Sequence, residues 1–588
     1  MHVATPQVLT QVTALGTPAR QAAIKPARGS SGMRRTAVRK PALESTAWQP
    51  PFVVPPTDFK WLGARVGVVG LGDSGLAMAR WLADQGAEVR ICDSRVSPPR
   101  LAEWQREHPQ ARFSGGTFEL GDSDWLDGLD CLAWSPGLSP YLGPSAALAA
   151  LVRERAIPVV GEIELFCRAI AQDPESPRVI AITGTNGKTT TSCLLAHLLA
   201  AAGTEVALAG NVGPPALEVW LERRRAGAPA AVWVLELSSF QLEFAPSLTP
   251  HAATILNLSE DHLDWHPGLV AYGAAKQQIF AQAATCVWNR DEPLTAPPPV
   301  GSRRDDRVMV SFGLDAPSHL GDFGIVWDGG LPWLAEGVAA EVSLHRRPVA
   351  ASKRAVRVNP LMPADALRIR GRHNHANALA ALALGRAAGV PMARLLHGLR
   401  DYAGEPHRCE SVAVIDDVEY VDDSKGTNVG ATVAALNGMG ATEDQAADQA
   451  ADQTAGEAVG EASANRAVTP RPRPRPRPRL WLIAGGDGKG QSFEPLAQPV
   501  ARHARAVLLI GQDASRLRAA LATTGVELID CATLEQAVQT AADRARTGDV
   551  VLLSPACASF GMFRNYLHRS ETFVAAVQQV ALRRGQPC

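Results

Sequence analysis

The chain lacks a strong charge of either sign, because its 58 Lys and Arg residues balance 59 Asp and Glu residues to a formal net charge of -1. We therefore expect no nucleic-acid partner and no attraction to an anionic membrane. No apolar run approaches the roughly 18 residues that cross a bilayer, so we expect no membrane insertion. The nine cysteines include no C-x-x-C pair and no metal-ligand spacing. This pattern predicts reduced thiols and a cytoplasmic protein rather than a disulfide framework.

Two segments lack the residues that a folded core requires. No acidic residue precedes Glu44, and the start of the chain is rich in Arg, Lys, Ala, Ser and Pro. We expect a disordered basic tail over residues 1–60, or a start at Met33, with a transit peptide as the alternative. Residues 441–479 run from DQAADQAADQ to RPRPRPRPR. We expect a disordered and partly extended insert there, with a docking segment for a partner protein as the alternative.

The rest of the chain alternates apolar strands with helices, which predicts the α/β class with parallel sheets. A length of 588 residues exceeds what one core supports. Breaks in the pattern favour three units, at residues 61–157, 158–403 and 404–588, the last of which contains the insert.

A glycine-rich turn opens the first unit. Its sequence GLGDSG, from Gly70 to Gly75, follows an apolar strand and precedes a helix, and Asp93 ends the next strand. The glycines allow a diphosphate to approach a helix N-terminus. The pattern by itself indicates a nicotinamide dehydrogenase or a protein that holds another nucleotide diphosphate, and a turn without a ligand is the third alternative.

A second glycine-rich turn opens the central unit and contains Gly184, Thr185, Asn186, Gly187, Lys188, Thr189 and Thr190. It keeps the Gly-Lys-Thr end of a P-loop, although Ile182 stands where the full pattern has its first glycine. Backbone N–H groups of such a turn cradle phosphates, its lysine meets the terminal phosphates, and its hydroxyl ligates Mg²⁺. A simple dehydrogenase has no use for this turn, and a simple ATPase has no use for the first one.

Further polar residues of the central unit follow apolar strands or begin a helix. Glu236 and His262 each follow such a strand, so both can reach the edge of the sheet where the P-loop lies. A carboxylate there suits Mg²⁺, and His262 is a second metal ligand or an exposed loop residue. Asn374 and Asn377 share one face near a predicted helix start. Their amides suit an adenine edge, and helix capping is the equal alternative.

In the last unit, polar residues also gather after predicted strands. They are His407, Arg408, Asp423, Ser424, Lys425, Thr427, Lys489 and Ser559, and the apolar Phe560 follows the last of them. Two lysines, a serine and a threonine suit an anionic ligand such as an amino dicarboxylic acid. Any one of them alone is also explained as a surface-loop residue.

Several motifs resemble one family. GTNGKTT, LELSSFQLE, LNLSEDHLDWH, GRHNHANALAALA, the HR pair at 407–408 and DDSKGTN occur in this order in Mur ligases, and the resemblance covers about residues 63–440 and 480–580. GEIELF, GGDGKG and LLSPACASFGMF resemble the branch that adds D-glutamate. Other branches carry a D-Y-x-H or D-Y-N type of sequence where this chain has Asp423-Ser424-Lys425. Tyr566 stands where close relatives have Phe.

The resemblance implies Rossmann-like first and third domains around a central P-loop ATPase domain. It implies ATP-dependent ligation of D-glutamate to UDP-N-acetylmuramoyl-L-alanine through an acyl phosphate, in peptidoglycan precursor synthesis. The implied cofactors are ATP and two Mg²⁺ ions, and we expect a monomer. A folylpolyglutamate-synthase-like ligase would share the P-loop but not the first glycine turn, and a non-catalytic nucleotide-binding or scaffold protein is the alternative from another class.

The resemblance also implies roles for individual residues. The UDP-substrate would contact Ser74, Asp93, Ser94, Arg95, Gly137, Asn211 and His262. ATP would contact the 184–190 turn together with Asn374, Asn377, Arg408 and Asp423. D-glutamate would contact Thr427, Lys489, Ser559 and Phe560. The metal ligands would be Thr189, Glu236, His262 and a carbamylated Lys276, and the catalytic residues Lys188, His262, Lys276 and Lys425. Without the resemblance, Lys276 is predicted to be a solvated helix lysine.

The insert gives the first testable prediction. Because residues 441–479 cannot bury a core, we expect their deletion to leave folding and catalytic activity largely intact. Circular dichroism and the turnover rate of the shortened chain check this. A chain that no longer folds would show instead that the insert is structural.

Overall fold

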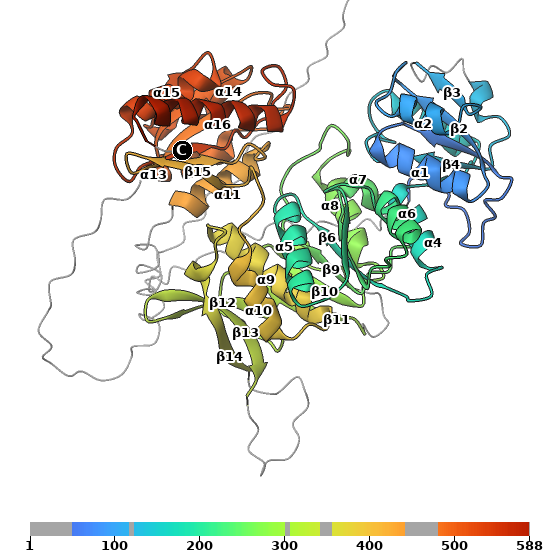
Figure 1. Cartoon of the computed structure of the whole chain (residues 1–588), viewed down its shortest axis with the longest axis horizontal. Coiled ribbons are helices and arrows are strands. Elements are labelled where there is room, and N and C mark those ends of the chain that lie inside the picture. Colours follow the sequence, from blue (N-terminus) through green and yellow to red (C-terminus); the bar gives the residue numbers. More distant parts are fainter. Residues whose placement is uncertain (1–49, 117–122, 300–305, 341–355, 441–479, 587–588) are drawn as a thin grey trace, which may run out of the picture. The chain divides into compact units, whose positions relative to one another are not determined.

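In the computed structural model, which describes residues 50–116, 123–299, 306–340, 356–440 and 480–586, the chain forms three sheets with helices between the strands (Figure 1). The predicted α/β fold of three domains is confirmed. The insert at 441–479 and the tail up to residue 49 lie outside the described residues. Among the helices of the described ranges, none is long and apolar enough to cross a membrane.

The N-terminal sheet has the strand order β3-β2-β1-β4-β5, and its strands are parallel. The chain leaves β1 in one direction and later crosses to β4 on its other side. At such a reversal the carboxyl ends of the strands form a crevice for ligands. The elements are β1 (Arg65–Val69), α1 (Asp73–Asp84), β2 (Glu88–Asp93), α2 (Leu101–Glu107), β3 (Arg112–Gly115), β4 (Cys131–Trp134), α3 (Ser145–Glu154) and β5 (Val159–Val160).

The central sheet has the order β14-β13-β12-β11-β10-β9-β6-β8-β7, and the strands from β12 to β7 are parallel. Its first half comprises α4 (Glu162–Ile170), β6 (Arg178–Thr183), α5 (Lys188–Ala201), β7 (Val206–Gly210), α6 (Ala216–Ala226), β8 (Val232–Glu236), α7 (Ser239–Leu242), β9 (Ala252–Ile255) and α8 (Leu269–Gln277). Its second half comprises β10 (Thr285–Asn289), β11 (Val308–Phe312), β12 (Phe323–Asp328), β13 (Leu331–Ala339), β14 (Val356–Pro363), α9 (Arg372–Ala387) and α10 (Met392–Asp401).

In the central sheet, the expectation of parallel strands is wrong at β13 and β14, which pair antiparallel with their neighbours. The turn between β12 and β13 contains Gly329 and Gly330 with φ of +59° and +83°. Two consecutive residues in this left-handed region form the tight turn that joins antiparallel strands. The Asp-Gly-Gly sequence was the signal for this hairpin.

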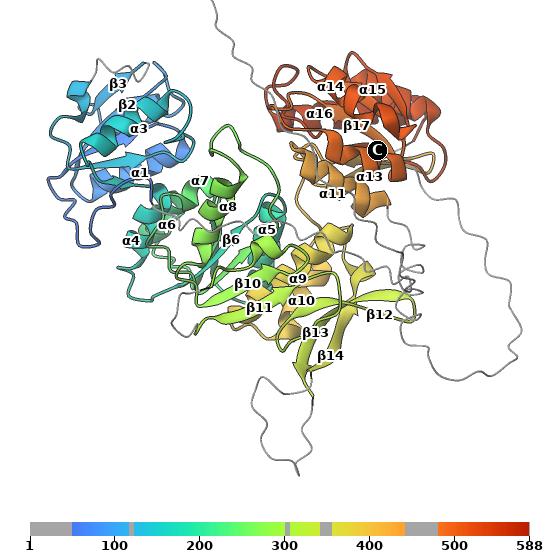
Figure 2. The ribbon, with the colours of Figure 1, turned by 180° about the vertical axis from the view of Figure 1, so that it is seen from behind.

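The C-terminal sheet has the order β15-β16-β20-β17-β18-β19, with β15 antiparallel to β16 and the other pairs parallel. Its elements are β15 (Glu410–Ile415), β16 (Val418–Asp422), α11 (Val429–Gly440), β17 (Leu480–Gly485), α13 (Ala497–His503), β18 (Ala504–Ile510), α14 (Ala514–Leu521), β19 (Glu527–Asp530), α15 (Leu534–Arg544), β20 (Val550–Leu553) and α16 (Tyr566–Arg583). Figure 2 shows these elements from behind.

Side chains of β17 show why this sheet is covered on both faces. Trp481 and Ile483 belong to an apolar cluster with α15 and α16, whereas Leu480 and Leu482 belong to another with α11, α13 and α14. Successive side chains of a strand point to opposite faces, so a continuous apolar run needs helices on both. The polar ends of the strands are left as the surface where a ligand can bind.

The glycine turn after β1 gives a prediction on stability. A Cβ on Gly75 would lie 1.9 Å from the carbonyl oxygen of Gly70, whereas a Cβ on Gly72 would have no atom within 4 Å. We expect Gly75→Ala to lower the free energy of unfolding by about 1–3 kcal/mol, because the first turn of α1 must move away from β1. Urea denaturation measures this loss, with Gly72→Ala as the control. Equal stability of the two variants would contradict the tight packing of this turn.

Candidate active site

The P-loop turn lies between β6 and α5. Gly187 precedes the helix with φ of +79°, and a Cβ at this position would meet the Asn377 side-chain oxygen at 2.6 Å. The Lys188 ammonium donates to the carbonyl oxygens of Gly184 and Thr185 at 2.9 and 2.8 Å, so it lies back over the turn. Burial lowers the pKa of Lys188, and the nearby Glu236 carboxylate partly offsets this effect. The turn has the N–H groups and the cation that hold a phosphate.

Glu236 ends β8 and is buried, with 1% of its surface exposed. Its Oε1 accepts from the Asn211 side-chain amide at 2.7 Å, whereas its Oε2 is buried with no hydrogen-bond partner among the described residues. A buried carboxylate oxygen without a partner is costly. A cation bound there would offset this cost, and Mg²⁺ prefers oxygen ligands.

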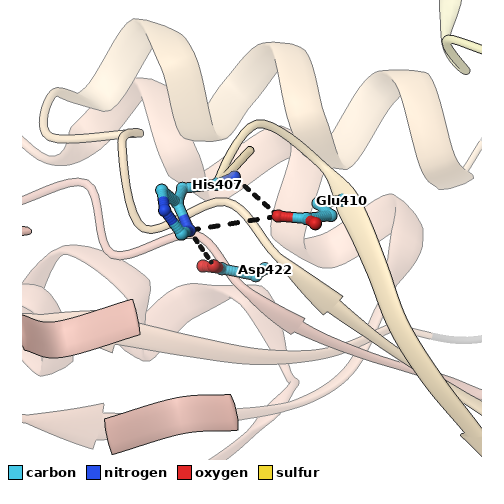
Figure 3. A group of neighbouring side chains, drawn as sticks. All are labelled: His407, Glu410 and Asp422. Atoms are coloured by element: carbon cyan, nitrogen blue, oxygen red, sulfur yellow. Dashed lines mark hydrogen bonds and ion pairs between the residues drawn. The ribbon is translucent and has the colours of Figure 1, made fainter. Parts of the chain in front are cut away.

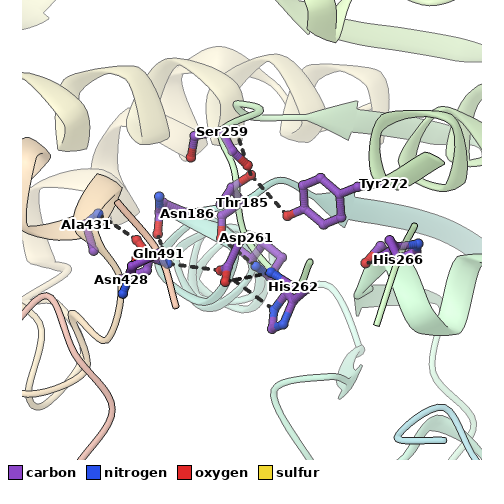
Figure 4. Close-up of polar contacts among 12 residues, drawn as sticks. Thr185, Asn186, Ser259, Asp261, His262, His266, Tyr272, Asn428, Ala431 and Gln491 are labelled. Carbon is purple, nitrogen blue, oxygen red and sulfur yellow. Dashed lines mark hydrogen bonds and ion pairs between the residues drawn. The ribbon is translucent and has the colours of Figure 1, made fainter. Parts of the chain in front are cut away.

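His262 lies in the loop after β9 with φ of +55°, and its backbone N–H donates to Asp261 at 2.9 Å (Figure 4). The Phe240 ring packs edge-on against the His262 imidazole, with the two ring centroids 4.7 Å apart. Burial lowers the pKa of His262, although Asp261 acts in the opposite direction. A neutral imidazole is the form that ligates a metal.

Lys276 lies on α8 and has 1% of its surface exposed, so the expectation of a solvated helix lysine is wrong. Its Nζ donates to the Gly184 carbonyl oxygen at 2.9 Å and to the Thr183 hydroxyl at 3.2 Å. Burial, together with the charge of Lys188, lowers the pKa of Lys276 well below its ordinary value. This lowered pKa favours the neutral amine, and the amine lies beneath the P-loop.

The two asparagines at the start of α9 are hydrogen-bonded to each other. The Asn377 amide donates to the Asn374 side-chain oxygen at 3.0 Å, and the Asn374 amide donates to the Arg370 carbonyl oxygen at 2.8 Å. Neither side chain caps the helix, since Gly371 holds that position. Both line the same cleft as the P-loop.

In the C-terminal domain, the turn after β16 carries Asp423 and Lys425. Asp423 is buried and accepts from the Ser554 hydroxyl at 2.7 Å. The Lys425 ammonium lies 3.7 Å from the centre of the Tyr566 ring, within the range of a cation–π contact. The turn therefore offers a carboxyl and an ammonium group at the carboxyl end of a strand.

The structure brings most of the predicted residues of the last two domains to one cleft. Its lining includes Thr185, Asn186, Gly187, Lys188, Thr189, Thr190, Asn211, Glu236, His262, Asn374, Asn377, Arg408, Asp423, Lys425, Thr427 and Lys489. Gly184, Lys276, Ser559 and Phe560 do not line it. Ser559 is buried beyond the end of β20, whereas the Phe560 side chain is exposed.

The residues predicted for the first domain lie at the carboxyl ends of its strands. Ser74 is in the first turn of α1 after β1, Asp93, Ser94 and Arg95 lie at the end of β2, and Gly137 follows β4. The Asp93 carboxylate accepts from the Leu71 N–H at 2.7 Å and from the Arg95 guanidinium at 2.8 and 2.7 Å. Burial alone would raise the pKa of Asp93, but these donors hold it below its ordinary value. The residues form a second group of polar side chains, at the reversal of strand order.

Two further residues, Tyr272 and Asn428, contact residues of the cleft and were not predicted from the sequence (Figure 4). The Tyr272 hydroxyl lies 3.1 Å from the Thr185 hydroxyl. The Asn428 amide donates to the side-chain oxygens of Asn186 and Asp261, at 3.1 Å each, while its own oxygen accepts from the Ala431 N–H at 2.8 Å. An asparagine just before a helix is a capping signal, which identifies the last contact but not the other two.

Comparison with known proteins covers all three domains. Residues 64–161 match the MurD-like N-terminal domain of Mur ligases, residues 182–385 the Mur ligase middle domain, and residues 447–557 the Mur ligase glutamate ligase domain. The chain is 50% identical over 530 residues to a protein of Burkholderia mallei strain SAVP1 named UDP-N-acetylmuramoylalanine--D-glutamate ligase, covering 88% of this chain and 97% of that protein. A protein of the same name from Burkholderia thailandensis matches with the same identity and coverage.

Asp423 gives a prediction on pH dependence. Burial raises its pKa to about 7 from an ordinary value of 3.8, although Ser554 and Arg408 favour the charged form. The folded state thus prefers the protonated carboxyl. Its contribution to stability is complete below about pH 4 and is lost as the pH rises through about 7.

Asparagine at this position keeps the shape and cannot ionise. We therefore expect Asp423→Asn to gain stability relative to the wild type between pH 4 and pH 8, by as much as about 4 kcal/mol. Urea denaturation across this range measures the difference. Asp417→Asn, at an exposed turn of the same domain, is the control and should follow the wild type. A constant difference for Asp423→Asn at all pH values would contradict the raised pKa.

Proposed function

Because the chain belongs to the Mur ligase family, we propose that it joins D-glutamate to UDP-N-acetylmuramoyl-L-alanine at the expense of ATP, in peptidoglycan precursor synthesis. The observation that carries the proposal is the grouping of Lys188, Glu236 and His262 in one cleft with Asp423 and Lys425. Relatives that carry the name of this ligase are matched over 97% of their length. The N-terminal domain match also removes the nicotinamide dehydrogenase alternative.

ATP is proposed to bind along the P-loop. Its terminal phosphates would take the place of the two carbonyl oxygens that the Lys188 ammonium now contacts. Asn374 and Asn377 would meet the adenine edge, and Arg408 and Asp423 would contact the rest of the nucleotide. Their positions in the lining of the same cleft support this arrangement.

The residues also fit Mg²⁺. The Oε2 of Glu236, which has no hydrogen-bond partner in the described part of the chain, and the Thr189 hydroxyl would hold one ion. His262 and a carbamylated Lys276 would hold the second. Bound Mg²⁺ would neutralise charge on the phosphate that is transferred. A neutral lysine amine adds to CO₂ with loss of a proton, and the lowered pKa of Lys276 favours this form; the product would be the carboxylate that a metal ligand requires.

The two remaining substrates are assigned to the outer domains. Ser74, Asp93, Ser94, Arg95 and Gly137 would hold the uridine diphosphate part of the first substrate, and Asn211 and His262 its reacting end. The order of strands and the Asp93–Arg95 pair at their carboxyl ends support this assignment. Thr427, Lys489, Ser559 and Phe560 would hold D-glutamate.

The proposed reaction has two steps. The alanyl carboxylate attacks the γ-phosphorus of ATP, the bond to the bridging oxygen breaks, and ADP leaves an acyl phosphate behind. The D-glutamate amine then attacks the acyl carbon, loses a proton, and expels inorganic phosphate. Lys188 and Lys425 would stabilise the negative charge that develops in both steps. Action in the cytoplasm and as a monomer remain predictions.

The test is ADP release in the presence of UDP-N-acetylmuramoyl-L-alanine, Mg²⁺ and one amino acid at a time. D-glutamate, L-glutamate, L-alanine, L-lysine and meso-diaminopimelate are compared, and we expect turnover with D-glutamate alone. Lys188→Ala should lower kcat by at least about tenfold, because a charge-assisted contact to phosphate is lost. Turnover with another amino acid would overturn the assignment of D-glutamate to the C-terminal domain. No ADP release with any of the five amino acids would overturn the proposed function.

A further inference from the structure

The first turn of α16 presents three side chains to the turn that carries Lys425. Tyr566, Arg569 and Ser570 are spaced at i, i+3 and i+4, so they lie on one face of the helix. The helix start is fixed by the Asn565 side chain, which accepts from the His568 N–H at 2.9 Å. The spacing makes this turn of the helix a rigid support.

Each of the three side chains holds a different part of the 422–425 turn. The Ser570 hydroxyl donates to Asp422 at 2.6 Å. The buried Arg569 guanidinium donates to the Ser424 hydroxyl and carbonyl oxygen at 3.1 and 2.8 Å. The Tyr566 ring lies beneath the Lys425 ammonium at 3.7 Å. The orientation of this turn therefore depends on α16.

Asp422 is the centre of the contact, with its side chain wholly buried. Its Oδ1 accepts from the Ser424 N–H at 2.8 Å, and its Oδ2 accepts from the Ser570 hydroxyl at 2.6 Å. The same Oδ2 lies 2.9 Å from His407 Nδ1 (Figure 3). His407, Glu410 and Asp422 place possible metal-ligand atoms within 4.8 Å of one another. Protein donors already account for both oxygens of Asp422, so the group acts as a hydrogen-bond network.

The same network fixes the proton of His407. Ser570 Oγ lies 2.7 Å from His407 Nδ1, and its single proton is directed at Asp422. Nδ1 therefore faces two oxygen acceptors, Ser570 Oγ and Asp422 Oδ2. We infer that the ring carries its proton on Nδ1, because an Nδ1 lone pair would repel the lone pairs of the carboxylate. Nε2 is then the nitrogen that can accept a hydrogen bond in the neutral ring.

His407 in turn determines the backbone on which Arg408 lies. Residues on both sides of Arg408 have positive φ, +63° at His407 and +49° at Cys409. Such conformations persist for residues other than glycine only where their surroundings hold them. The His407 N–H donates to Glu410 at 2.8 Å, and its carbonyl oxygen accepts from the Lys425 N–H at 3.2 Å. The loop with Arg408 and the turn with Lys425 are thus joined through His407.

We propose that Ser570 is a positioning residue for the ligation step: through Asp422 and His407 it holds Arg408 and Lys425 in the orientation that meets the transferred phosphate and the acyl phosphate. The inference rests on the proposed function, because that function assigns Arg408 to ATP and Lys425 to the negative charge that develops during the transfer. Ser570 itself is buried and does not line the cleft. It therefore acts through other residues and not on a substrate.

The test compares kcat and KM of the full-length enzyme for Ser570→Ala, Ser570→Thr and the control Thr572→Ala. The control removes a hydroxyl from the same helix, where it donates to the His568 carbonyl oxygen at 2.7 Å and does not line the cleft. We expect Ser570→Ala to lower kcat by at least about tenfold, because a buried carboxylate loses a hydrogen-bond donor. KM for UDP-N-acetylmuramoyl-L-alanine, which the N-terminal domain holds, should stay within about twofold of the wild type.

Ser570→Thr keeps the hydroxyl and should restore most of the turnover, whereas Thr572→Ala should match the wild type. Asp422→Asn turns an acceptor for His407 Nδ1 into a donor and should reduce kcat at least as far as Ser570→Ala. If Ser570→Ala does not fold, Ser570→Cys replaces it, since a thiol is a weak donor of similar shape. A kcat for the Ala or Cys variant within about twofold of the wild type would overturn the proposal.

An equal loss in Ser570→Ala and Thr572→Ala would also overturn it, because the effect would then come from the helix as a whole. The wild-type enzyme separates this proposal from the proposed function. If the wild type makes no product with D-glutamate, the function fails. If it does and the Ser570 variants match it, only the role of Ser570 fails.

Discussion

The candidate site depends on ionisable groups that are buried without full compensation at the carboxyl ends of the central strands. Lys188 and Lys276 both lie against the P-loop, and burial lowers the pKa of each. The nearby Glu236 has one oxygen held by Asn211 and the other without a partner among the described residues. Such a site is stabilised by a ligand that brings phosphate oxygens to Lys188 and a divalent cation to Glu236. The turn at 184–190 would supply the contacts to phosphate, and Glu236 at the end of β8 and His262 in the loop after β9 would supply the contacts to the cation.

The residues that follow the ends of strands are the part of the candidate site that could be predicted from the sequence. Lys188, Glu236, His262 and Lys425 each follow an apolar run, and the carboxyl ends of parallel strands meet at one edge. Lys276 could not be found in this way, since nothing in a helical segment indicates that a lysine is buried beneath a loop from another element. The role proposed for Lys276 comes from the family resemblance, and only its burial comes from the structure.

Contacts between distant parts of the chain account for most of what the sequence analysis missed. Ser570 meets Asp422 across 148 positions, and Asn428 meets Asn186 across 242. No local pattern reports such pairs, because periodicity and capping describe neighbours within a few residues. The antiparallel strands β13 and β14 are a different case. The Asp-Gly-Gly sequence before β13 is a local signal for a hairpin between antiparallel strands. The prediction of parallel strands followed the regular alternation of strands and helices in the rest of the chain and did not use this signal.

Burial of Lys276 also selects the reagents that can reach it. The Lys276 side chain has 1% of its surface exposed, and its amine is hydrogen-bonded to Thr183 and Gly184. A bulky electrophile therefore cannot reach this amine. A small, linear and uncharged molecule such as carbon dioxide can diffuse through transient gaps in a packed interior, whereas an acyl donor the size of a coenzyme cannot. The fold thus selects by size and charge among the reagents that can reach the Lys276 amine.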